Sequence, residues 1–320
     1  MGDKTAISWT SKTWNPWRGC TRVSPGCAHC YALARMDKLG FDPYTVTRTK
    51  TWADPLRWQA EAQAAGVQER VFTCSWSDWF HPDADAWRDE AWDIVRRCPN
   101  LIFQILTKRP NLIGWPEDPR LLDSQKYGRW TRLPADWGLG YPNVWLGVSI
   151  ESRQFLWRME FLRRIPARIR FISAEPLLGP LVLTKQPEAL TTGTPSLARE
   201  EAEKLFPEDE AEQMEYVERE SLSFYENSLP FKQLDLAGFQ WVIVGGESGP
   251  GFRPMDHAWA REIRDQCQRE HVAFFFKQSA AIRTEMGTEL DGREWKEYPL
   301  LTSPESPVPS PESRQAPEAR

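Results

Sequence analysis

Residues 70–110 read RVFTCSWSDWFHPDADAWRDEAWDIVRRCPNLIFQILTKRP. A short apolar run at 71–74 gives way to polar residues, then to helical spacing at 84–97, and then to a second apolar run at 101–106. Apolar runs this short, separated by an amphipathic helix, are typical of buried parallel strands. The stretch therefore predicts one strand–helix–strand unit of a parallel sheet.

The same pattern continues along the chain. Further apolar runs that end in polar, charged or glycine residues lie at 144–148, 169–172, 241–244 and 273–276, and further helices are expected at 31–39, 55–65 and 152–164. Short strands alternating with helices indicate parallel βα units. The expected fold class is α/β, with about six or seven parallel strands.

Polar or charged side chains follow the expected strands, where each strand ends. In barrels of parallel strands the carboxyl ends line the active site, so these side chains are candidates for cofactor or substrate binding. The alternative is that they begin loops, cap helices or form ion pairs that close the barrel. The candidates are Ser75, Asp78, Lys108, Glu175 and Lys277, together with the glycine-rich segment described below.

Residues 19–31, GCTRVSPGCAHCY, hold three of the six cysteines with spacing C-x6-C-x2-C. Thiolates so close in one loop can bind one soft metal centre, and three ligands leave one iron of a 4Fe-4S cluster open. Zinc would need a fourth ligand from elsewhere, and a disulfide with one free thiol would suit a secreted protein. An iron–sulfur cluster at Cys20, Cys27 and Cys30 is the favoured interpretation.

A second chemical signal follows the run at 241–244. Glycines after a strand let the backbone approach a ligand, and the carboxylate among them can accept hydrogen bonds from a ribose or an amino group. Four glycines can also simply make turns. The candidates for cofactor binding are Gly245, Gly246, Glu247 and Ser248.

Composition limits the function classes. The chain has 320 residues, 41% of them hydrophobic, and no window is apolar enough for a membrane span, so a cytoplasmic protein is expected. The net charge of −5 conceals an uneven distribution: residues 186–236 hold thirteen acidic and four basic residues, whereas residues 1–58 have an excess of basic residues. An anionic substrate near the cysteine loop is compatible with this distribution.

Residues 1–302 are expected to form one domain with two insertions. Residues 111–142 are rich in proline and glycine and predict a loop insertion over the active-site face, while 186–236 predict an acidic, partly mobile insertion with a helix near 196–220. Residues 303–320 are rich in Pro, Ser and Glu and predict a disordered tail.

Several blocks in order give the chain a family resemblance over about residues 6–280. It resembles the bacteriophage-associated protein family of unknown function that is related to radical S-adenosylmethionine (radical SAM) enzymes. The blocks are Trp14-Asn15-Pro16, Gly19-Cys20-Thr21, Pro25-Gly26-Cys27, Cys30-Tyr31-Ala32, Leu106-Thr107-Lys108-Arg109-Pro110, Trp145-Leu146-Gly147-Val148-Ser149, Glu175-Pro176-Leu177-Leu178-Gly179-Pro180, Val242-Ile243-Val244-Gly245-Gly246-Glu247-Ser248-Gly249 and Phe275-Phe276-Lys277-Gln278.

The resemblance implies a partial (β/α) TIM-like barrel that holds a 4Fe-4S cluster, with Cys20, Cys27 and Cys30 at the ligand positions. It also implies S-adenosyl-L-methionine as cofactor, reductively cleaved to a 5'-deoxyadenosyl radical, and an electron donor such as flavodoxin or ferredoxin. The substrate class considered is nucleic acid or nucleotide, and no catalytic residue is assigned. The alternative is a non-catalytic, phage-associated metal-binding protein that acts through a partner. In this family pattern, unlike the usual superfamily one, the first cysteine gap is six residues and the Gly-Gly-Glu element comes late.

Overall fold

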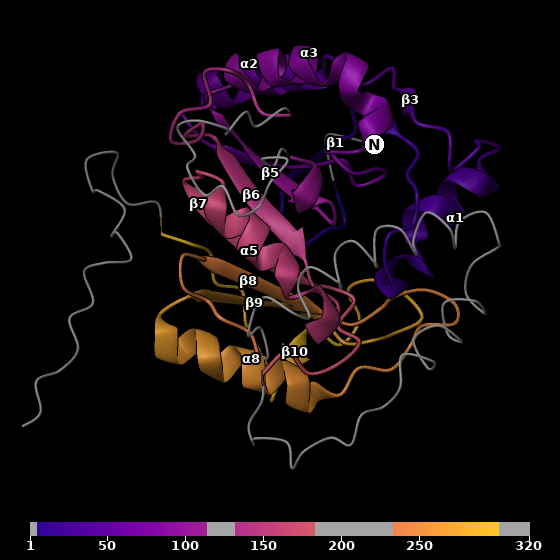
Figure 1. Cartoon of the computed structure of the whole chain (residues 1–320), viewed down its shortest axis with the longest axis vertical. Helices are drawn as coiled ribbons and strands as arrows, with labels where there is room; N and C mark the ends of the chain where they lie inside the picture. Colours follow the sequence, from indigo (N-terminus) through magenta and orange to yellow (C-terminus); the bar gives the residue numbers. More distant parts are fainter. Residues whose placement is uncertain (1–4, 114–131, 183–232, 301–320) are drawn as a thin grey trace, which may run out of the picture.

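The computed structural model describes residues 5–113, 132–182 and 233–300, and its centre is a sheet of seven parallel strands (Figure 1). The strands lie side by side in the order in which they follow one another along the chain, and the sheet curls as an open half-barrel. The strands in spatial order are β1 (Lys12–Trp14), β4 (Glu69–Thr73), β5 (Leu101–Thr107), β6 (Val144–Ser149), β7 (Ile169–Ala174), β8 (Trp241–Gly245) and β9 (Ala273–Gln278). The expected α/β class with parallel strands is confirmed.

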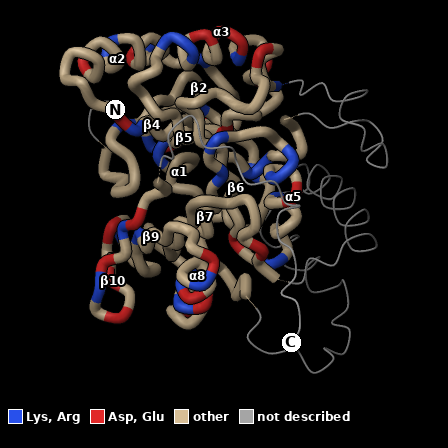
Figure 2. Tube along the Cα trace, turned by 90° about the vertical axis from the view of Figure 1, so that its left-hand side faces the viewer, with Lys and Arg blue, Asp and Glu red and all other residues tan. Residues whose placement is uncertain are grey.

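Helices cover the outer face of the half-barrel. The sheet contacts α2 (Asp54–Ala65), α5 (Trp157–Arg164) and α8 (His257–Glu270), while α3 (Asp85–Arg96) packs beside α2 (Figure 1). Because side chains alternate along a strand, one set of residues meets these helices and the other lines the inner face. Charged residues of both signs are frequent along the helices and around β10 (Glu289–Leu290), and the strands between them are mostly uncharged (Figure 2).

The inner face has its own aromatic core. It is formed by nine buried residues, which are Trp9, Phe72, Ile102, Trp145, Ile169, Phe171, Trp241, Ile243 and Phe275. The rings of Trp9, Phe171 and Trp241 pack with centroids 5.6–6.5 Å apart. This core fills the barrel at the level of the strands, so the space for chemistry lies beyond the strands' carboxyl ends.

The expected helices at 31–39, 55–65 and 84–97 are confirmed as α1 (Tyr31–Lys38), α2 and α3. The helix expected at 152–164 is a 3-10 turn at Arg153–Phe155 followed by α5. The sequence reasoning gave no range for α8, for β1, for the hairpin of β2 (Trp17–Arg18) with β3 (Thr47–Arg48), or for that of β10 with β11 (Arg293–Glu294).

Several expectations fall outside the described residues. These are the acidic insertion at 186–236 with its helix, apart from residues 233–236, and the tail at 303–320. Of the loop insertion at 111–142, residues 111–113 and 132–142 are described. The second part packs against the outer helices: the ring of Trp137 lies 5.3 Å from that of Trp92 in α3, and its Nε1 donates to Pro166 O at 2.8 Å. No helix in the described part is long and apolar enough to cross a membrane.

Candidate functional site

The cysteine loop lies against the carboxyl ends of the strands. It follows β1 and β2 and runs through a 3-10 turn at Pro25–Cys27 into α1. Its first part is fixed by backbone hydrogen bonds from Gly19 N to Trp76 O (3.1 Å) and from Cys20 N to Pro43 O (2.9 Å). Gly19 has φ +95°, and a Cβ there would lie 2.7 Å from the carbonyl carbon of Thr45, so only glycine fits.

The three thiols of the loop are free and close enough to influence one another electrostatically. Burial raises the pKa of Cys20 to about 12, although Arg109 opposes the rise. Burial and the neighbouring Cys27 also raise the pKa of Cys30, against the amide groups of Ala32 and Leu33 at the start of α1. Without a metal these two thiols are therefore protonated, and binding a metal as thiolates would release protons.

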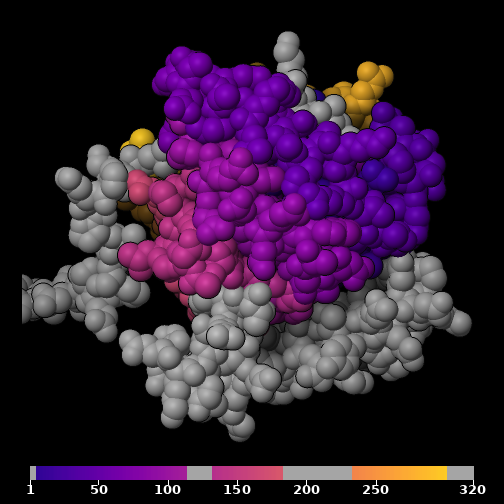
Figure 3. All heavy atoms as spheres, turned by 90° about the horizontal axis from the view of Figure 1, so that it is seen from above, coloured from indigo at the N-terminus to yellow at the C-terminus, as the bar shows by residue number. Residues whose placement is uncertain are grey.

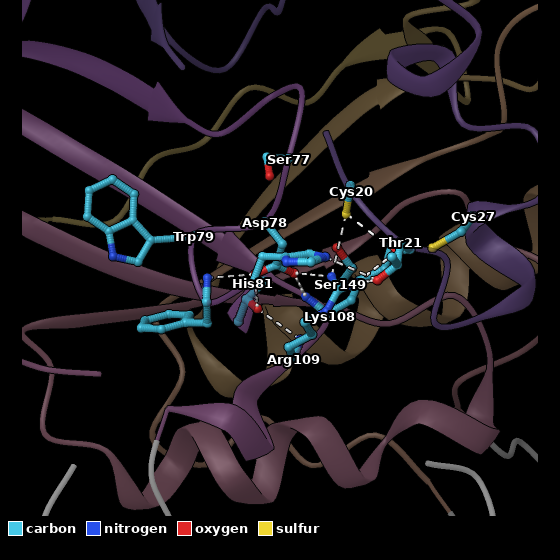
Figure 4. Close-up of polar contacts among 12 residues, drawn as sticks. Cys20, Thr21, Cys27, Ser77, Asp78, Trp79, His81, Lys108, Arg109 and Ser149 are labelled. Carbon is cyan, nitrogen blue, oxygen red and sulfur yellow. Dashed lines mark hydrogen bonds and ion pairs between the residues drawn. The ribbon is translucent and has the colours of Figure 1, made fainter. Parts of the chain in front are cut away.

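A buried ion pair at the ends of β4 and β5 holds the start of the loop (Figure 4). Arg109 Nη1 lies 3.2 Å from Asp78 Oδ2 and donates to Cys20 Sγ at 3.6 Å, while Nη2 donates to Thr21 O at 2.7 Å. Thr21 Oγ1 lies 3.2 Å from His81 Nε2, whose pKa burial lowers to about 4 with help from Arg109. His81 is therefore neutral at physiological pH.

Glu151, two residues beyond β6, holds the middle of the loop. Its side chain is fully buried, pairs with Lys108, and lies 2.9 Å from Arg158 Nη1. Ser24 Oγ donates to Glu151 Oε1 at 2.8 Å, and a Cβ on Gly26 would lie 2.7 Å from Glu151 Cδ. The loop and this carboxylate are therefore packed in direct contact.

Glu247, two residues beyond β8, holds the end of the loop. His29 Nδ1 lies 2.9 Å from its Oε2, and Arg253 donates to the same carboxylate from its backbone N at 2.8 Å and from Nη2 at 2.5 Å. Burial raises the pKa of Glu247, but the bonds from Arg253 and His29 outweigh burial and lower it overall. Glu247, a candidate ligand for the cofactor, therefore contacts His29, one of the two residues between the second and third cysteines.

Glu175 and Lys277 form a pair that joins the ends of β7 and β9 across β8. Lys277 Nζ lies 2.5 Å from Glu175 Oε1, and both side chains are mostly buried. Gly245 lies between them, and a Cβ there would come 3.2 Å from Glu175 Cδ. The negative charge of Glu175 also raises the pKa of Tyr31, after the larger effects of burial and Cys30, so this pair lies near the third cysteine.

The remaining candidates have structural partners. A Cβ on Gly246 would lie 2.6 Å from Ala280 Cα, so this glycine allows the chain after β8 to approach the chain after β9. Ser248 forms an isolated parallel bridge with Ala281. Ser75 Oγ lies 3.0 Å from Asn15 Nδ2, and its carbonyl accepts the hydroxyl of Tyr31.

The structure thus brings most of the predicted strand-end residues to one edge of the sheet, and it adds four that sequence reasoning did not propose. These are Arg109, Glu151, His29 and Arg253. Glu151 could have been found, because it continues the inner-facing alternation of Trp145, Gly147 and Ser149 by one more step. No sequence signal pointed to the contact between His29 and Glu247.

The donor set fits a soft metal centre in its chemistry. Three reduced thiols, the amino end of α1 and the cation Arg109 together suit an anionic cluster bound through thiolates. Yet no three His, Cys, Asp or Glu side chains in the described ranges are already arranged as a metal-binding group. To hold a metal, the three thiols would have to come into a different arrangement.

Three comparisons place the chain among known proteins. No curated protein matches it. Among solved structures it is similar to spore photoproduct lyase complexed with dinucleoside spore photoproduct, at 12% identity, and to a double mutant of that lyase with bound AdoMet and dinucleoside spore photoproduct, at 13% identity. Each has a TM-score of 0.38, and each match covers 84% of this chain and 64% of the other, so the chain spans less than two thirds of their length. The model of the family described as "Protein of unknown function (DUF5131)" matches residues 4–299, and the chain belongs to that family.

Proposed function

We propose that the protein is a phage-associated iron–sulfur enzyme of the radical SAM type, which reductively cleaves S-adenosylmethionine to act on a nucleic acid or nucleotide. The observation that carries this proposal is the position of the three-cysteine loop. Three side chains just beyond strand ends hold this loop: Arg109 after β5, Glu151 after β6 and Glu247 after β8. Thiol ligands at the carboxyl ends of parallel strands lie where barrel enzymes carry their chemistry.

Cys20, Cys27 and Cys30 would hold a 4Fe-4S cluster, with one iron left for an outside ligand. When bound, this cluster would supply the electron for cleavage of the sulfonium, received from a flavodoxin or ferredoxin. The chain's own contribution is to hold the loop at the strand ends. The protonated thiols of Cys20 and Cys30 must lose their protons to become ligands.

The pair of Glu175 and Lys277 is the proposed contact for S-adenosylmethionine. Neither residue hydrogen-bonds to the cysteine loop in the described structure, in contrast to Glu247. The cofactor's amino group and carboxylate carry both signs of charge, so they could exchange partners with this ion pair. Gly245 lets Glu175 pack closely against the end of β8, since a Cβ there would come 3.2 Å from Glu175 Cδ.

Iron and sulfide counting on anaerobically purified full-length protein tests the metal assignment. We expect Cys27→Ala to lose the cluster and Cys98→Ala to keep it, because Cys98 is buried under α2, with Sγ 3.5 Å from Pro55 O. Cys74→Ser should also keep the cluster. It is the stricter control, since Cys74 lies close enough to Cys20 for a charge on one sulfur to affect the other. Equal iron content in Cys27→Ala and Cys98→Ala would refute the site.

A cleavage assay with a chemical reductant then tests the reaction. Wild-type protein should release methionine from S-adenosylmethionine, and Cys27→Ala should not. A wild-type protein that holds zinc in place of iron, or that holds the cluster but cleaves nothing, would favour a non-catalytic metal-binding protein that acts through a partner.

A further inference from the structure

We infer that Arg109, held in place by Asp78, is a positioning residue that controls how firmly the metal centre is retained at Cys20 and how readily it is reduced. This inference rests on the proposed function and names the residues that regulate its metal centre. The contact that carries it is the hydrogen bond from Arg109 Nη1 to Cys20 Sγ, at 3.6 Å (Figure 4).

The guanidinium of Arg109 contacts both Cys20, the first expected ligand, and the next residue, Thr21. Besides Cys20 Sγ it donates from Nη2 to Thr21 O at 2.7 Å and to Thr21 Oγ1 at 2.8 Å. Only 5% of Arg109 is exposed, so these bonds are not shared with bulk water. A rigid fork of donors that contacts both the thiol and the next residue fixes the direction in which the ligand points.

Asp78 fixes the guanidinium in turn. Its carboxylate lies 3.2 Å from Arg109 Nη1 and also accepts hydrogen bonds from Thr107 Oγ1 at 2.7 Å, Lys108 N at 3.0 Å and Phe80 N at 2.9 Å. These donors belong to the ends of β4 and β5 and the turns that follow them, the rigid part of the barrel. The first cysteine is therefore tied through Arg109 to the sheet.

The other two cysteines have different surroundings. Ser24 Oγ, a neutral group, lies 3.7 Å from Cys27 Sγ, and Cys30 faces the amide groups of Ala32 and Leu33. A cation bonded to one ligand sulfur makes the three ligands unequal. Its effect should therefore be visible as a property of the centre itself.

The expected effect has a definite sign. Reduction adds one electron from a low-potential donor to the centre, with no bond broken and no proton transferred, so the reduced centre is more negative by one charge. A buried positive charge and a hydrogen bond to a ligand sulfur stabilise that extra charge and raise the reduction potential. The carboxylate of Asp78 opposes part of this effect, because it lies beside the same guanidinium.

A purely structural role predicts a different pattern. If the buried pair only joined β4 to β5, loss of either partner would weaken folding and shift the potential alike. If Arg109 acts on the centre by its charge, loss of Arg109 and loss of Asp78 must shift the potential in opposite directions. The sign of the shift therefore distinguishes the two roles.

The experiment uses the full-length chain, loaded anaerobically with ferrous iron and sulfide and titrated with dithionite while the reduced centre is followed by electron paramagnetic resonance. We expect Arg109→Gln to shift the potential to more negative values and to lose iron several-fold faster to a chelator. Arg109→Lys, which keeps the charge without the fork, should recover the potential in large part and the retention less. Asp78→Asn should shift the potential to more positive values.

Arg88→Gln is the matched control. Arg88 is also a buried arginine with one carboxylate partner and carbonyl acceptors, Trp79 O at 2.9 Å and His81 O at 2.6 Å, but it makes no described contact with the cysteine loop. It should lower the melting temperature and leave the potential unchanged.

A wild-type potential and iron retention in Arg109→Gln would overturn the inference, and so would equal negative shifts in Arg109→Gln and Asp78→Asn. If Arg109→Gln does not fold, Arg109→Lys decides: a potential equal to that of wild type with unchanged retention would count against a role for the fork. A wild-type chain that takes up no iron–sulfur centre would refute the proposed function first, and this inference with it.

Discussion

At the scale of single residues, the contact between Gly26 and Glu151 shows how closely the cysteine loop fits the sheet. Glu151 is fully buried and its oxygens are held by Lys108, Arg158 and Ser24, so its side chain has nowhere to move. The sequence alone does not explain why position 26 is a glycine. The reason is a neighbour more than a hundred residues away along the chain, which no local pattern can reveal.

Gly26→Ala should therefore destabilise the protein and reduce cluster loading together. The added Cβ would lie 2.5–2.7 Å from the end of the Glu151 side chain, and overpacking of this kind costs about 1–3 kcal/mol. Urea unfolding and iron counting measure the two effects. The control is Gly179→Ala, where the nearest atom is 4.0 Å away. Equal stability of the two variants would mean that the loop is not packed on Glu151.

Glu151 also predicts a pH dependence. Burial by itself would raise the pKa of this carboxyl, but Arg158 and Lys108 outweigh burial and lower the pKa to about 2. Because the folded pKa lies below the ordinary value of 4.5, the ionised carboxylate stabilises the fold fully above about pH 4.5, and this contribution is lost as the pH falls towards 2.

We expect Glu151→Gln to lower the free energy of unfolding by about 3–5 kcal/mol at neutral pH, since it leaves buried cations unpaired. The difference from wild type should shrink in urea titrations carried out at progressively lower pH below 4.5. Glu90→Gln is the control, because Glu90 pairs with Arg48 at the surface. A deficit that stays constant down to pH 3 would contradict the electrostatic explanation.

At the scale of elements, the sequence predicted the six longer strands and most helices, because each combines an apolar run with a polar end. It did not predict β1, because three residues are too few to show the alternation of apolar and polar side chains that indicates a strand. β1 is a strand because Lys12, Thr13 and Trp14 pair with 71–73 of β4, and Trp14 is buried among Trp79 and Phe103. Tertiary pairing, and not local preference, makes this element.

The strand ends predict a division of roles among the charged residues. Glu247 pairs with His29 of the cysteine loop, and Lys108 pairs with Glu151, which accepts a hydrogen bond from the loop. Glu175 and Lys277, by contrast, pair only with each other in the described structure. We expect Glu175→Gln to weaken S-adenosylmethionine binding about ten- to a hundredfold, as loss of a charged hydrogen bond of ~1.5–3 kcal/mol implies. Calorimetry on the iron-loaded protein measures it, alongside the melting temperature.

Glu61→Gln serves as the control for that experiment, since Glu61 pairs with Arg57 at the exposed surface of α2, on the outside of the sheet. Lost stability with intact binding in Glu175→Gln would show that the pair closes the barrel and does not serve the cofactor. In that case the alternative interpretation of the strand-end charges, as ion pairs within the scaffold, would be right.

At the scale of the whole molecule, the first part of the chain is rich in tryptophan because it builds a core. Trp14, Trp17, Trp79 and Trp92 form a continuous series of ring contacts with centroids 4.9–5.7 Å apart. Seen from above, residues of the first third of the chain, in indigo and purple, form one continuous surface over this core (Figure 3). The chain has seventeen tryptophans, but only the packing shows that the four rings named above are buried and not free to stack on a base.

An open half-barrel leaves β9 as an edge strand, and the segment after β11 covers it. Phe276 N donates to Trp295 O at 2.8 Å, Glu297 N donates to Phe274 O at 3.1 Å, and Glu297 Oε2 accepts from Phe274 N at 3.0 Å. Edge strands with unpaired backbone groups are sites of aggregation unless they are covered. Residues 295–297 therefore complete the sheet, although no apolar run identifies them in the sequence.

Two truncations test this division of the C-terminal region. A chain that ends at residue 302 should keep the melting temperature and cluster content of the full chain, because the proline-rich segment that it lacks has little apolar surface to bury. A chain that ends at residue 292 should aggregate or melt well below the full chain, because it exposes the backbone of β9 and removes Glu297 O as the acceptor for Trp241 Nε1. Light scattering and thermal melts compare the two. A stable monomer ending at 292 would show that β9 needs no cover, and a marked loss of stability in the chain ending at 302 would show that residues beyond 302 pack on the barrel.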